Sequence, residues 1–171
     1  MRYKIVFLTY HNWKTRRLGG FHKFAEHTCA KGYNTIFFSF ERPYYTFFKK
    51  DERQNRNVLK KLSKGEYYRV GNSYILNLTL PTFAPPGILR KILPRKIIVW
   101  SQTHSVKSFR KFYSKYFLGT DFFVFESNES LLLFNEIKKL FPSSIYIYRP
   151  SDPLMASPDT FYHKYEKQIL K

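Results

Sequence analysis

The sequence predicts an α/β fold: a Rossmann-like, mostly parallel sheet with helices on both faces. Short apolar runs of strand length recur along the 171 residues. Segments with helically spaced apolar residues lie between successive runs, and glycine or proline marks the turns. Alternation of strands and helices at this spacing is typical of parallel sheets. The length suffices for one core but not for two full α/β domains, so residues 1–171 are expected to form a single domain.

The first forty residues predict a βαβ unit. Residues 4–10 form an apolar run of strand length, and residues 34–40 form another. Between them, residues 21–32 place apolar side chains at helical spacing and end in Gly32, a helix stop signal. The connecting loop, residues 11–20, contains two adjacent arginines and two adjacent glycines. Because ligands in open α/β sheets bind at the carboxyl ends of the strands, this loop is expected to lie at a binding edge.

The middle of the chain predicts a hairpin followed by an irregular connection. Residues 67–70 and 73–78 are strand-like and are joined through Gly71 and Asn72, a turn sequence. Residues 80–94 form a proline-punctuated segment with isolated apolar and basic residues, which predicts a loop.

The second half returns to the alternating pattern. Apolar runs predict strands at residues 97–100, 121–126 and 144–149. Helical patterns occupy residues 105–117 and 129–140, each between two of these strands. One more helix is predicted near the end of the chain.

The predicted helix at residues 105–117 is amphipathic and basic. It has two interpretations, because a basic amphipathic helix can lie on an anionic membrane, whereas every crossover helix needs an apolar stripe against its sheet. Its apolar stripe consists of Val106, Phe109, Tyr113 and either Tyr116 or Phe117, and its basic residues off that stripe are Lys107, Arg110, Lys111 and Lys115.

Charge and aromatic content restrict the partner class. The net charge is +18, and aromatic residues make up 20% of the chain. Residues 1–25 contain six Lys or Arg and no acid, and residues 67–120 contain nine and no acid. Such a field attracts nucleic acid, anionic lipid headgroups or phosphorylated small molecules. Interleaved aromatic residues suit base stacking and a membrane interface equally, so charge names a partner class and not a function.

Several kinds of site receive no support. The five histidines show no metal-ligand spacing, no Walker A sequence or serine nucleophile elbow is present, and Gly19-Gly20 alone is no dinucleotide fingerprint. We therefore predict no metal and no cofactor. The single cysteine, Cys29, falls on a predicted helix face among core residues and permits no disulfide scaffold. With no apolar stretch of membrane-spanning length and no signal-peptide order at the N-terminus, a cytoplasmic location is expected.

Two carboxylates fall at the ends of predicted strands, where chemistry takes place in such sheets. Glu126 ends one strand and Asp152 follows another. A carboxylate there can accept the proton of a hydroxyl nucleophile. The alternatives are a turn role for Asp152 and a capping or loop-ordering role for Glu126 with Ser127 or Asn128. Both remain open at this point.

The loop between the first strand and helix is a candidate phosphate site. Arg16 and Arg17 could bind a phosphate together with the outward-pointing amides at the start of the following helix. The adjacent Gly19-Gly20 favours this interpretation, and the alternative is a solvated basic loop.

Together these motifs resemble a known family. The run His11-Asn-Trp-x-x-Arg-Arg-x-x-Gly-Phe-His22 resembles the start of glucuronosyltransferase-like bacterial glycosyltransferases, relatives of the enzyme that adds glucuronate to the lipid-linked xanthan intermediate. The agreement continues in Leu80-Pro, in Phe125-Glu-Ser127 and in Tyr148-Arg-x-Ser-Asp152. It covers most of the chain in the expected order.

The resemblance implies a GT-B architecture, in which two Rossmann-like domains face a cleft. The N-terminal domain holds the acceptor, and the C-terminal domain binds the nucleotide sugar. It also implies an inverting, metal-independent transfer in which Asp152 removes the proton from the acceptor hydroxyl. The acceptor would be a polyprenyl-diphosphate-linked sugar, so peripheral association with the inner face of the plasma membrane is expected. The donor-binding domain is not found within residues 1–171, and the chain alone is expected to be inactive.

The resemblance and the residue patterns together give a set of candidate site residues. The expected acceptor- or phosphate-binding residues are Arg16, Arg17, Gly19, Gly20, His22, Glu126, Ser127 and Arg149. The expected membrane contacts are Phe47, Phe48, Lys49, Lys50, Ile88, Leu89, Arg90 and Lys91. The alternative function is a non-enzymatic basic domain that binds an anionic membrane or nucleic acid, although RNA-recognition, KH and zinc-finger signatures are missing.

Overall fold

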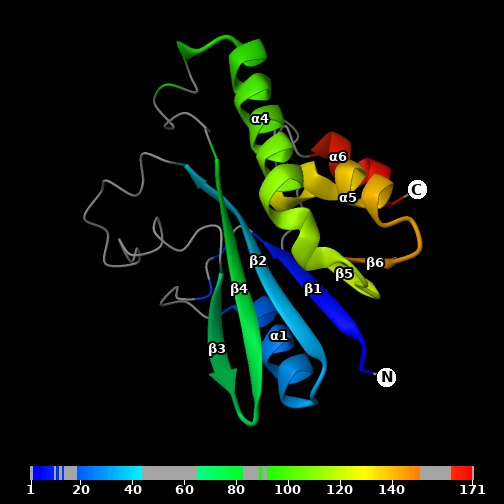
Figure 1. The fold of residues 1–171 in the computed structure, drawn as a ribbon. Coiled ribbons are helices and arrows are strands. Elements are labelled where there is room, and N and C mark those ends of the chain that lie inside the picture. Colours follow the sequence, from blue (N-terminus) through cyan, green and yellow to red (C-terminus); the bar gives the residue numbers. More distant parts are fainter. Residues whose placement is uncertain are drawn as a thin grey trace.

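Six strands and their connecting helices form one α/β sheet structure (Figure 1). The computed structural model describes residues 2–9, 11, 13, 19–43, 65–82, 89, 92–150 and 163–170. The strands are β1 Lys4–Thr9, β2 Asn34–Pro43, β3 Glu66–Val70, β4 Ser73–Thr82, β5 Phe122–Glu126 and β6 Ile145–Arg149. The helices are α1 Gly20–Ala30, α4 Arg95–Tyr113, α5 Phe134–Leu140 and α6 His163–Ile169, with 3₁₀ turns η2 Ser114–Phe117 and η3 Glu129–Leu133.

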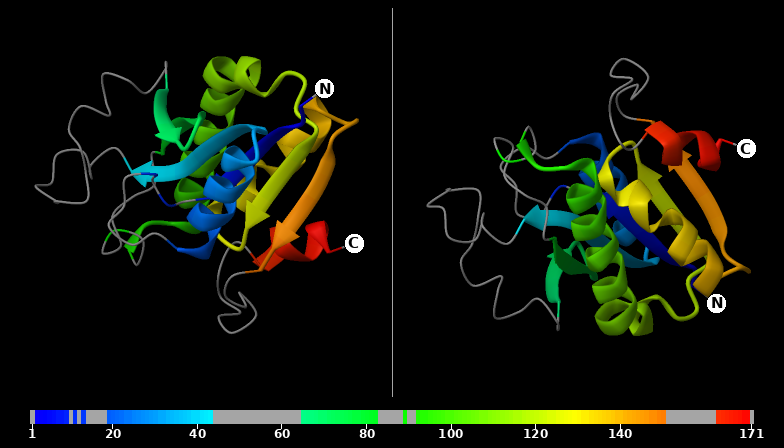
Figure 2. Two further views of the ribbon diagram at one scale, coloured as in Figure 1. Left: turned by 90° about the horizontal axis from the view of Figure 1, so that it is seen from below. Right: turned by 90° about the horizontal axis from the view of Figure 1, so that it is seen from above.

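The sheet has the strand order β3-β4-β2-β1-β5-β6. Every neighbouring pair is parallel except the β3–β4 hairpin. The chain first moves outward from β1 to β2, and then returns past β1 to β5 and β6. Because crossovers between parallel strands are right-handed, these opposite directions place α1 on one face and α4 and α5 on the other (Figure 2). The predicted mostly parallel sheet with helices on both faces is therefore confirmed.

Successive side chains of each strand point to opposite faces of the sheet and form two apolar layers, one under α4 and α5 and one under α1. On the α4 face, the rings of Phe38, Phe109 and Phe117 are fully buried and pack edge to face or tilted, with centroids 5.3–5.5 Å apart. The Tyr113 hydroxyl donates to the backbone carbonyl of Thr79 at 2.7 Å and ties α4 to β4. The apolar stripe predicted for residues 105–117 thus packs on the sheet. The α1 layer contains Phe7, Trp13, Phe21, Ala25, Cys29, Phe37, Ile75 and Val124.

The strand predicted at residues 97–100 is wrong. These residues form the beginning of α4, which starts after Pro94 and runs without a break into the helix predicted at 105–117. Ile97 and Trp100 are exposed, with 64% of Trp100 accessible, so this apolar run does not enter the sheet. A run of four apolar residues does not by itself distinguish a strand from a helix. The first turns of α4 extend past the strand tips (Figure 1).

The other predicted elements appear close to their expected limits. β4 continues through Leu80–Thr82, which the sequence assigned to a loop, because these residues pair with the end of β2. The predicted helix at residues 129–140 is divided into η3 and α5. Within the part of the chain that the structure describes, no helix is both long and apolar enough to cross a membrane.

Candidate functional site

A row of polar side chains lies where three parallel strands end. On the α1 face, β1, β5 and β6 carry apolar residues in register until the last position of each strand. There Thr9, Glu126 and Arg149 follow one another across the sheet. This edge also receives the beginning of α1, as expected for a binding edge in such a sheet.

Glu126 is a buried carboxylate with fixed partners on both oxygens. Only 7% of its side chain is accessible. Its Oε2 accepts hydrogen bonds from Thr9 Oγ1 at 2.5 Å and from Asn128 Nδ2 at 2.9 Å. Its Oε1 lies 3.8 Å from Arg149 Nη1. A buried charge is costly unless it is paired and hydrogen-bonded, and these three contacts meet that need.

The turn after β5 is fixed by the same network. Asn128 Oδ1 accepts a hydrogen bond from the Ser130 backbone N–H at 3.0 Å and caps η3. Ser130 Oγ donates to the backbone carbonyl of Leu8 at 3.1 Å, which connects this turn to β1. On the β1 side, the backbone N–H of His11 donates to Thr9 Oγ1 at 3.2 Å. The carboxyl ends of β1 and β5 are therefore cross-linked by side chains.

Arg149 extends from β6 toward the first turn of α1. Its guanidinium carbon lies 6.0 Å from the centroid of the buried Phe21 ring, and 39% of the side chain is accessible. Its Nη2 lies so close to Gly20 that a Cβ there would be 3.0 Å away. Helix α1 begins after Gly19 without a side-chain cap and has no acid in its first turn. The helix dipole and the guanidinium thus both make this place favourable for an anion.

His22 and Trp13 are buried in the α1 layer, beneath the polar row at the strand ends. The His22 side chain is fully buried, and its ring centroid lies 4.7 Å from that of Phe37 and 5.5 Å from that of Trp13. His11 is half-buried, and its ring centroid lies 6.2 Å from that of His22. The Ser39 hydroxyl donates to the His11 backbone carbonyl at 2.7 Å. His22 is therefore part of the packed layer beneath the polar row.

On the opposite face, Tyr148 connects the end of β6 to α6. Its hydroxyl donates to the carboxylate of the buried Glu166, and it also interacts with Ser127. Burial, and then the hydrogen bond and negative charge of Glu166, raise the pKa of Tyr148 well above its ordinary value, while Ser127 acts in the opposite direction. Helix α6 is thereby held against the strand that precedes Asp152.

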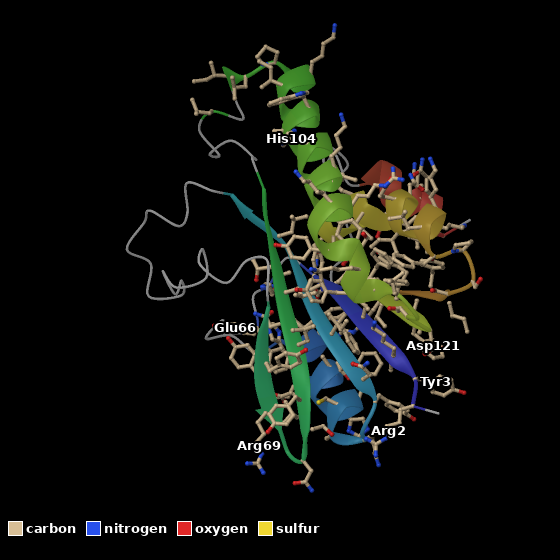
Figure 3. All side chains as sticks on the ribbon, viewed as in Figure 1. Arg2, Tyr3, Glu66, Arg69, His104 and Asp121 are labelled. Carbon is tan, nitrogen blue, oxygen red and sulfur yellow. The ribbon has the colours of Figure 1, made fainter. Side chains whose placement is uncertain are left out.

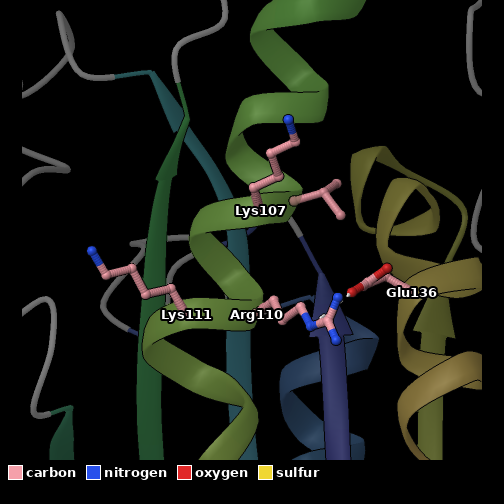
Figure 4. Close-up of a pocket in the computed structure, with 5 residues that line it drawn as sticks. Lys107, Arg110, Lys111 and Glu136 are labelled. Carbon is pink, nitrogen blue, oxygen red and sulfur yellow. Dashed lines mark ion pairs between the residues drawn. The ribbon is translucent and has the colours of Figure 1, made fainter.

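A second basic region lies on the outer face of α4. A groove of about 550 Å³ between α4 and α5 is lined by Val106, Lys107, Arg110, Lys111 and Glu136. The Arg110 guanidinium points to Glu136, with Nε 3.7 Å from Oε1, while Lys107 and Lys111 extend in other directions (Figure 4).

The beginning of α4 adds exposed apolar surface to this basic face. Ile92, Ile97 and Trp100 are exposed beside the exposed Lys96. The Trp100 ring lies 5.7 Å from that of His104, which Figure 3 shows on the upper part of α4. We call these residues, Ile92, Lys96, Ile97 and Trp100, the α4 tip.

The structure brings together some of the expected site residues. Gly19, Gly20, Glu126 and Arg149 meet at one edge. Ser127 is also buried, but it interacts with Tyr148 on the opposite face of the sheet. The role of Thr9 was not anticipated from the sequence, although its position at the end of an apolar strand is the signal that could have indicated it. Leu89 is the one expected membrane contact among the described residues, and it is exposed.

The remaining candidates lie outside the described residues: Arg16, Arg17, Phe47, Phe48, Lys49, Lys50, Ile88, Arg90, Lys91 and Asp152. Among the residues that the structure does describe, no group of three or more His, Cys, Asp or Glu side chains is placed to hold a metal ion.

Comparison with known proteins adds a family. The family model described as "Glucuronosyltransferase GumK, N-terminal domain" matches residues 7–171, which is nearly the whole chain. No curated protein matches the chain.

Proposed function

The chain belongs to the family of GumK glucuronosyltransferase N-terminal domains, and we propose that it is the acceptor-binding half of an inverting, metal-independent enzyme. The family makes it a glycosyltransferase acceptor-binding domain of polysaccharide synthesis, with the Rossmann-like fold of a GT-B N-terminal domain. A nucleotide sugar is the donor and a saccharide is the acceptor. In the proposal, the acceptor is a lipid-linked saccharide of bacterial surface polysaccharide synthesis, and a separate donor-binding domain completes the enzyme.

The observation that carries this proposal is the polar row at the carboxyl ends of β1, β5 and β6. Arg149, whose side chain is 39% accessible, and the first turn of α1 form a positively polarised place at the sheet edge. A diphosphate attached to a saccharide supplies the complementary charge, because a guanidinium binds phosphate oxygens in pairs and helix amides donate to them. The acceptor's lipid diphosphate would lie there, with its sugar directed toward the donor domain.

The proposed reaction is a single displacement. An acceptor hydroxyl oxygen attacks the anomeric carbon of the donor sugar, and a new C–O bond forms there. The bond from that carbon to the nucleoside diphosphate breaks, and the leaving group keeps the electron pair. The Asp152 carboxylate takes the hydroxyl proton, which makes the oxygen a stronger nucleophile as it attacks. Asp152 follows β6 by three residues, which is the support for its assignment to this edge.

Membrane association is a second part of the proposal. A lipid-linked acceptor stays in the bilayer, so its enzyme must reach the membrane surface. The α4 tip combines exposed apolar and aromatic side chains with Lys96, and the basic groove continues along the same helix. Such a helix end suits the interface of an anionic membrane, where Trp is favoured and lysines meet lipid headgroups. We place the domain peripherally on the cytoplasmic face of the plasma membrane.

The test uses the chain joined to a donor-binding domain of the same family. Asp152→Asn should lower sugar transfer by about 10²–10⁴-fold, the usual contribution of a general base, while the protein stays folded. Asp159→Asn is the matched control, because Asp159 lies in the same connection between β6 and α6. Transfer by Asp152→Asn at the control's rate would contradict the assignment.

A further inference from the structure

We propose that Glu126 and Gly20 position the Arg149 guanidinium over the first turn of α1. Glu126 does this without touching the acceptor, and Gly20 does it through the absence of a side chain, which leaves room for the guanidinium. The inference rests on the proposed function, in which Arg149 meets the acceptor's diphosphate. It assigns different roles to residues that the sequence grouped together as ligand contacts.

Glu126 does not bind an anionic ligand directly. Its Oε2 is occupied by Thr9 and Asn128, and its Oε1 faces Arg149. A carboxylate that approached a diphosphate would repel it, and more strongly in a buried setting than in water. Its influence on an anionic ligand therefore passes through Arg149.

The two ends of the guanidinium show how it is held. Nη1 faces Glu126 Oε1 at 3.8 Å, while Nη2 lies over Gly20. The guanidinium carbon lies 6.0 Å from the centroid of the Phe21 ring, within the range of a cation–π interaction. Because a guanidinium is a planar fork with donors in fixed directions, fixing one end also fixes where the other end points. Glu126 thus turns the free edge of Arg149 toward the helix amides.

Gly20 is small because Arg149 lies against it. Glycines 32, 65, 71 and 119 have a positive φ, and Gly20 is not among them, so its backbone conformation does not require glycine. A Cβ at position 20 would lie 3.0 Å from Arg149 Nη2, whereas a Cβ at position 19 would meet no atom of the described residues within 4 Å. Alanine at position 20 is therefore tolerated by the helix but requires the guanidinium to shift by a few tenths of an ångström. Position 19 offers the matched substitution without that contact.

The first arm of the experiment uses the 171-residue chain without ligand. NMR measures the rate at which the Arg149 guanidinium rotates about its Cζ–Nε bond. Glu126→Gln and Gly20→Ala should each raise this rate at least about threefold over the wild type, and Gly19→Ala should leave it unchanged. Glutamine keeps an oxygen for Thr9 and Asn128, and Gly20→Ala leaves the buried network intact, so a folding defect in one variant does not remove the test. Unchanged rotation in both variants would overturn the inference.

The second arm adds inorganic diphosphate and follows the amide signals of Gly19, Gly20 and Phe21. Relative to the wild type, Arg149→Gln should weaken binding at least about tenfold, and Glu126→Gln and Gly20→Ala should weaken it about three- to tenfold. Wild-type affinity in Glu126→Gln and Gly20→Ala, together with loss in Arg149→Gln, would refute positioning but leave the anion site. No binding by the wild type would refute the anion site of the proposed function, and the rotation rates would still decide whether Arg149 is positioned.

Discussion

Helices α1 and α4 have the same sequence pattern and different surroundings. Each combines an apolar stripe that packs on the sheet with basic residues and an acid-free first turn. Helix α1 begins at the strand ends, so its first turn meets the guanidinium of Arg149. Helix α4 begins past the strand tips, so its first turns expose Trp100 and its neighbours (Figure 1). The place where a helix starts relative to the sheet edge, and not its pattern, determines which surface it offers.

This contrast also divides α4 within itself. Its second half is a core element, with Phe109 fully buried between β2 and η2, whereas its tip contacts little of the sheet. In the proposed function, the start of α1 serves the polar end of the acceptor and the α4 tip serves the membrane that carries it.

The largest expected effect separates the two halves of α4. Phe109→Ala should lower the free energy of unfolding by about 3–5 kcal/mol, because it leaves a cavity between the packed rings of Phe38 and Phe117. Trp100→Ala should change it by no more than about 0.5 kcal/mol, as for other exposed positions. Urea denaturation of both variants measures the difference. Equal losses would mean that the α4 tip is a core element and that the contrast is wrong.

The next effect concerns the membrane. The double variant Ile97→Ser/Trp100→Ser should lower binding to vesicles that contain anionic lipid by at least about tenfold, since two apolar side chains would no longer enter the interface. Flotation measures the bound fraction. Tyr67→Ser is the control, because Tyr67 is also exposed but lies on β3.

The same variants distinguish a membrane from a nucleic acid. If the double variant floated as well as the wild type while the protein bound generic DNA with a steep salt dependence, the α4 tip would not be a membrane contact. The alternative function, a basic nucleic-acid-binding domain, would then be favoured.

A smaller effect is expected at alkaline pH. The pKa of Tyr148 is raised above its ordinary value of 10.0, because burial disfavours the ionised phenolate and the hydrogen bond to Glu166, together with its negative charge, favours the neutral phenol. The native state therefore holds this proton more tightly than the unfolded state, and stability should fall as the pH rises above about 10. Tyr148→Phe should reduce this alkaline decline in the free energy of unfolding. The exposed Tyr67→Phe is the control, and identical declines in both variants would contradict the role of Tyr148.

The smallest effect is expected for the ion pair in the basic groove. Arg110 and Glu136 are 3.7 Å apart, and the Arg110 side chain is largely exposed. Such pairs contribute about 0–1 kcal/mol, so Arg110→Gln should hardly change the urea midpoint. It should still weaken vesicle binding measurably, since each basic side chain near an anionic surface contributes about 1 kcal/mol. A marked loss of stability would instead show that the Arg110–Glu136 ion pair is needed to hold α4 against α5.

Strands and the hairpin were predictable because their apolar runs end at clear turn residues, as at Gly71 and Asn72. The strand prediction for residues 97–100 is wrong because a run of four apolar residues does not show whether its side chains are buried. Ile97 and Trp100 are exposed at the start of a helix and do not lie in a buried strand.

The sequence named two residues of the polar row, Glu126 and Arg149, but not Thr9 and not the contacts among them. Glu126 and Arg149 could be named because they end apolar runs that become neighbouring parallel strands. The bond from Thr9 to Glu126 joins residues 117 positions apart and depends on strand register, which one sequence does not specify. For the same reason, the contact between Arg149 and Gly20 could be seen only in three dimensions.

The most direct test of the acceptor-domain assignment compares two ligands on the 171-residue chain. Amide NMR spectra are recorded with a short-chain prenyl-diphosphate-linked saccharide and, separately, with a nucleotide sugar. We predict that the lipid-linked saccharide shifts the signals of Gly19, Gly20 and Arg149, and that the nucleotide sugar binds at least about tenfold more weakly. Tighter binding of the nucleotide sugar at this edge would contradict the account, because the chain would then be the donor-binding half.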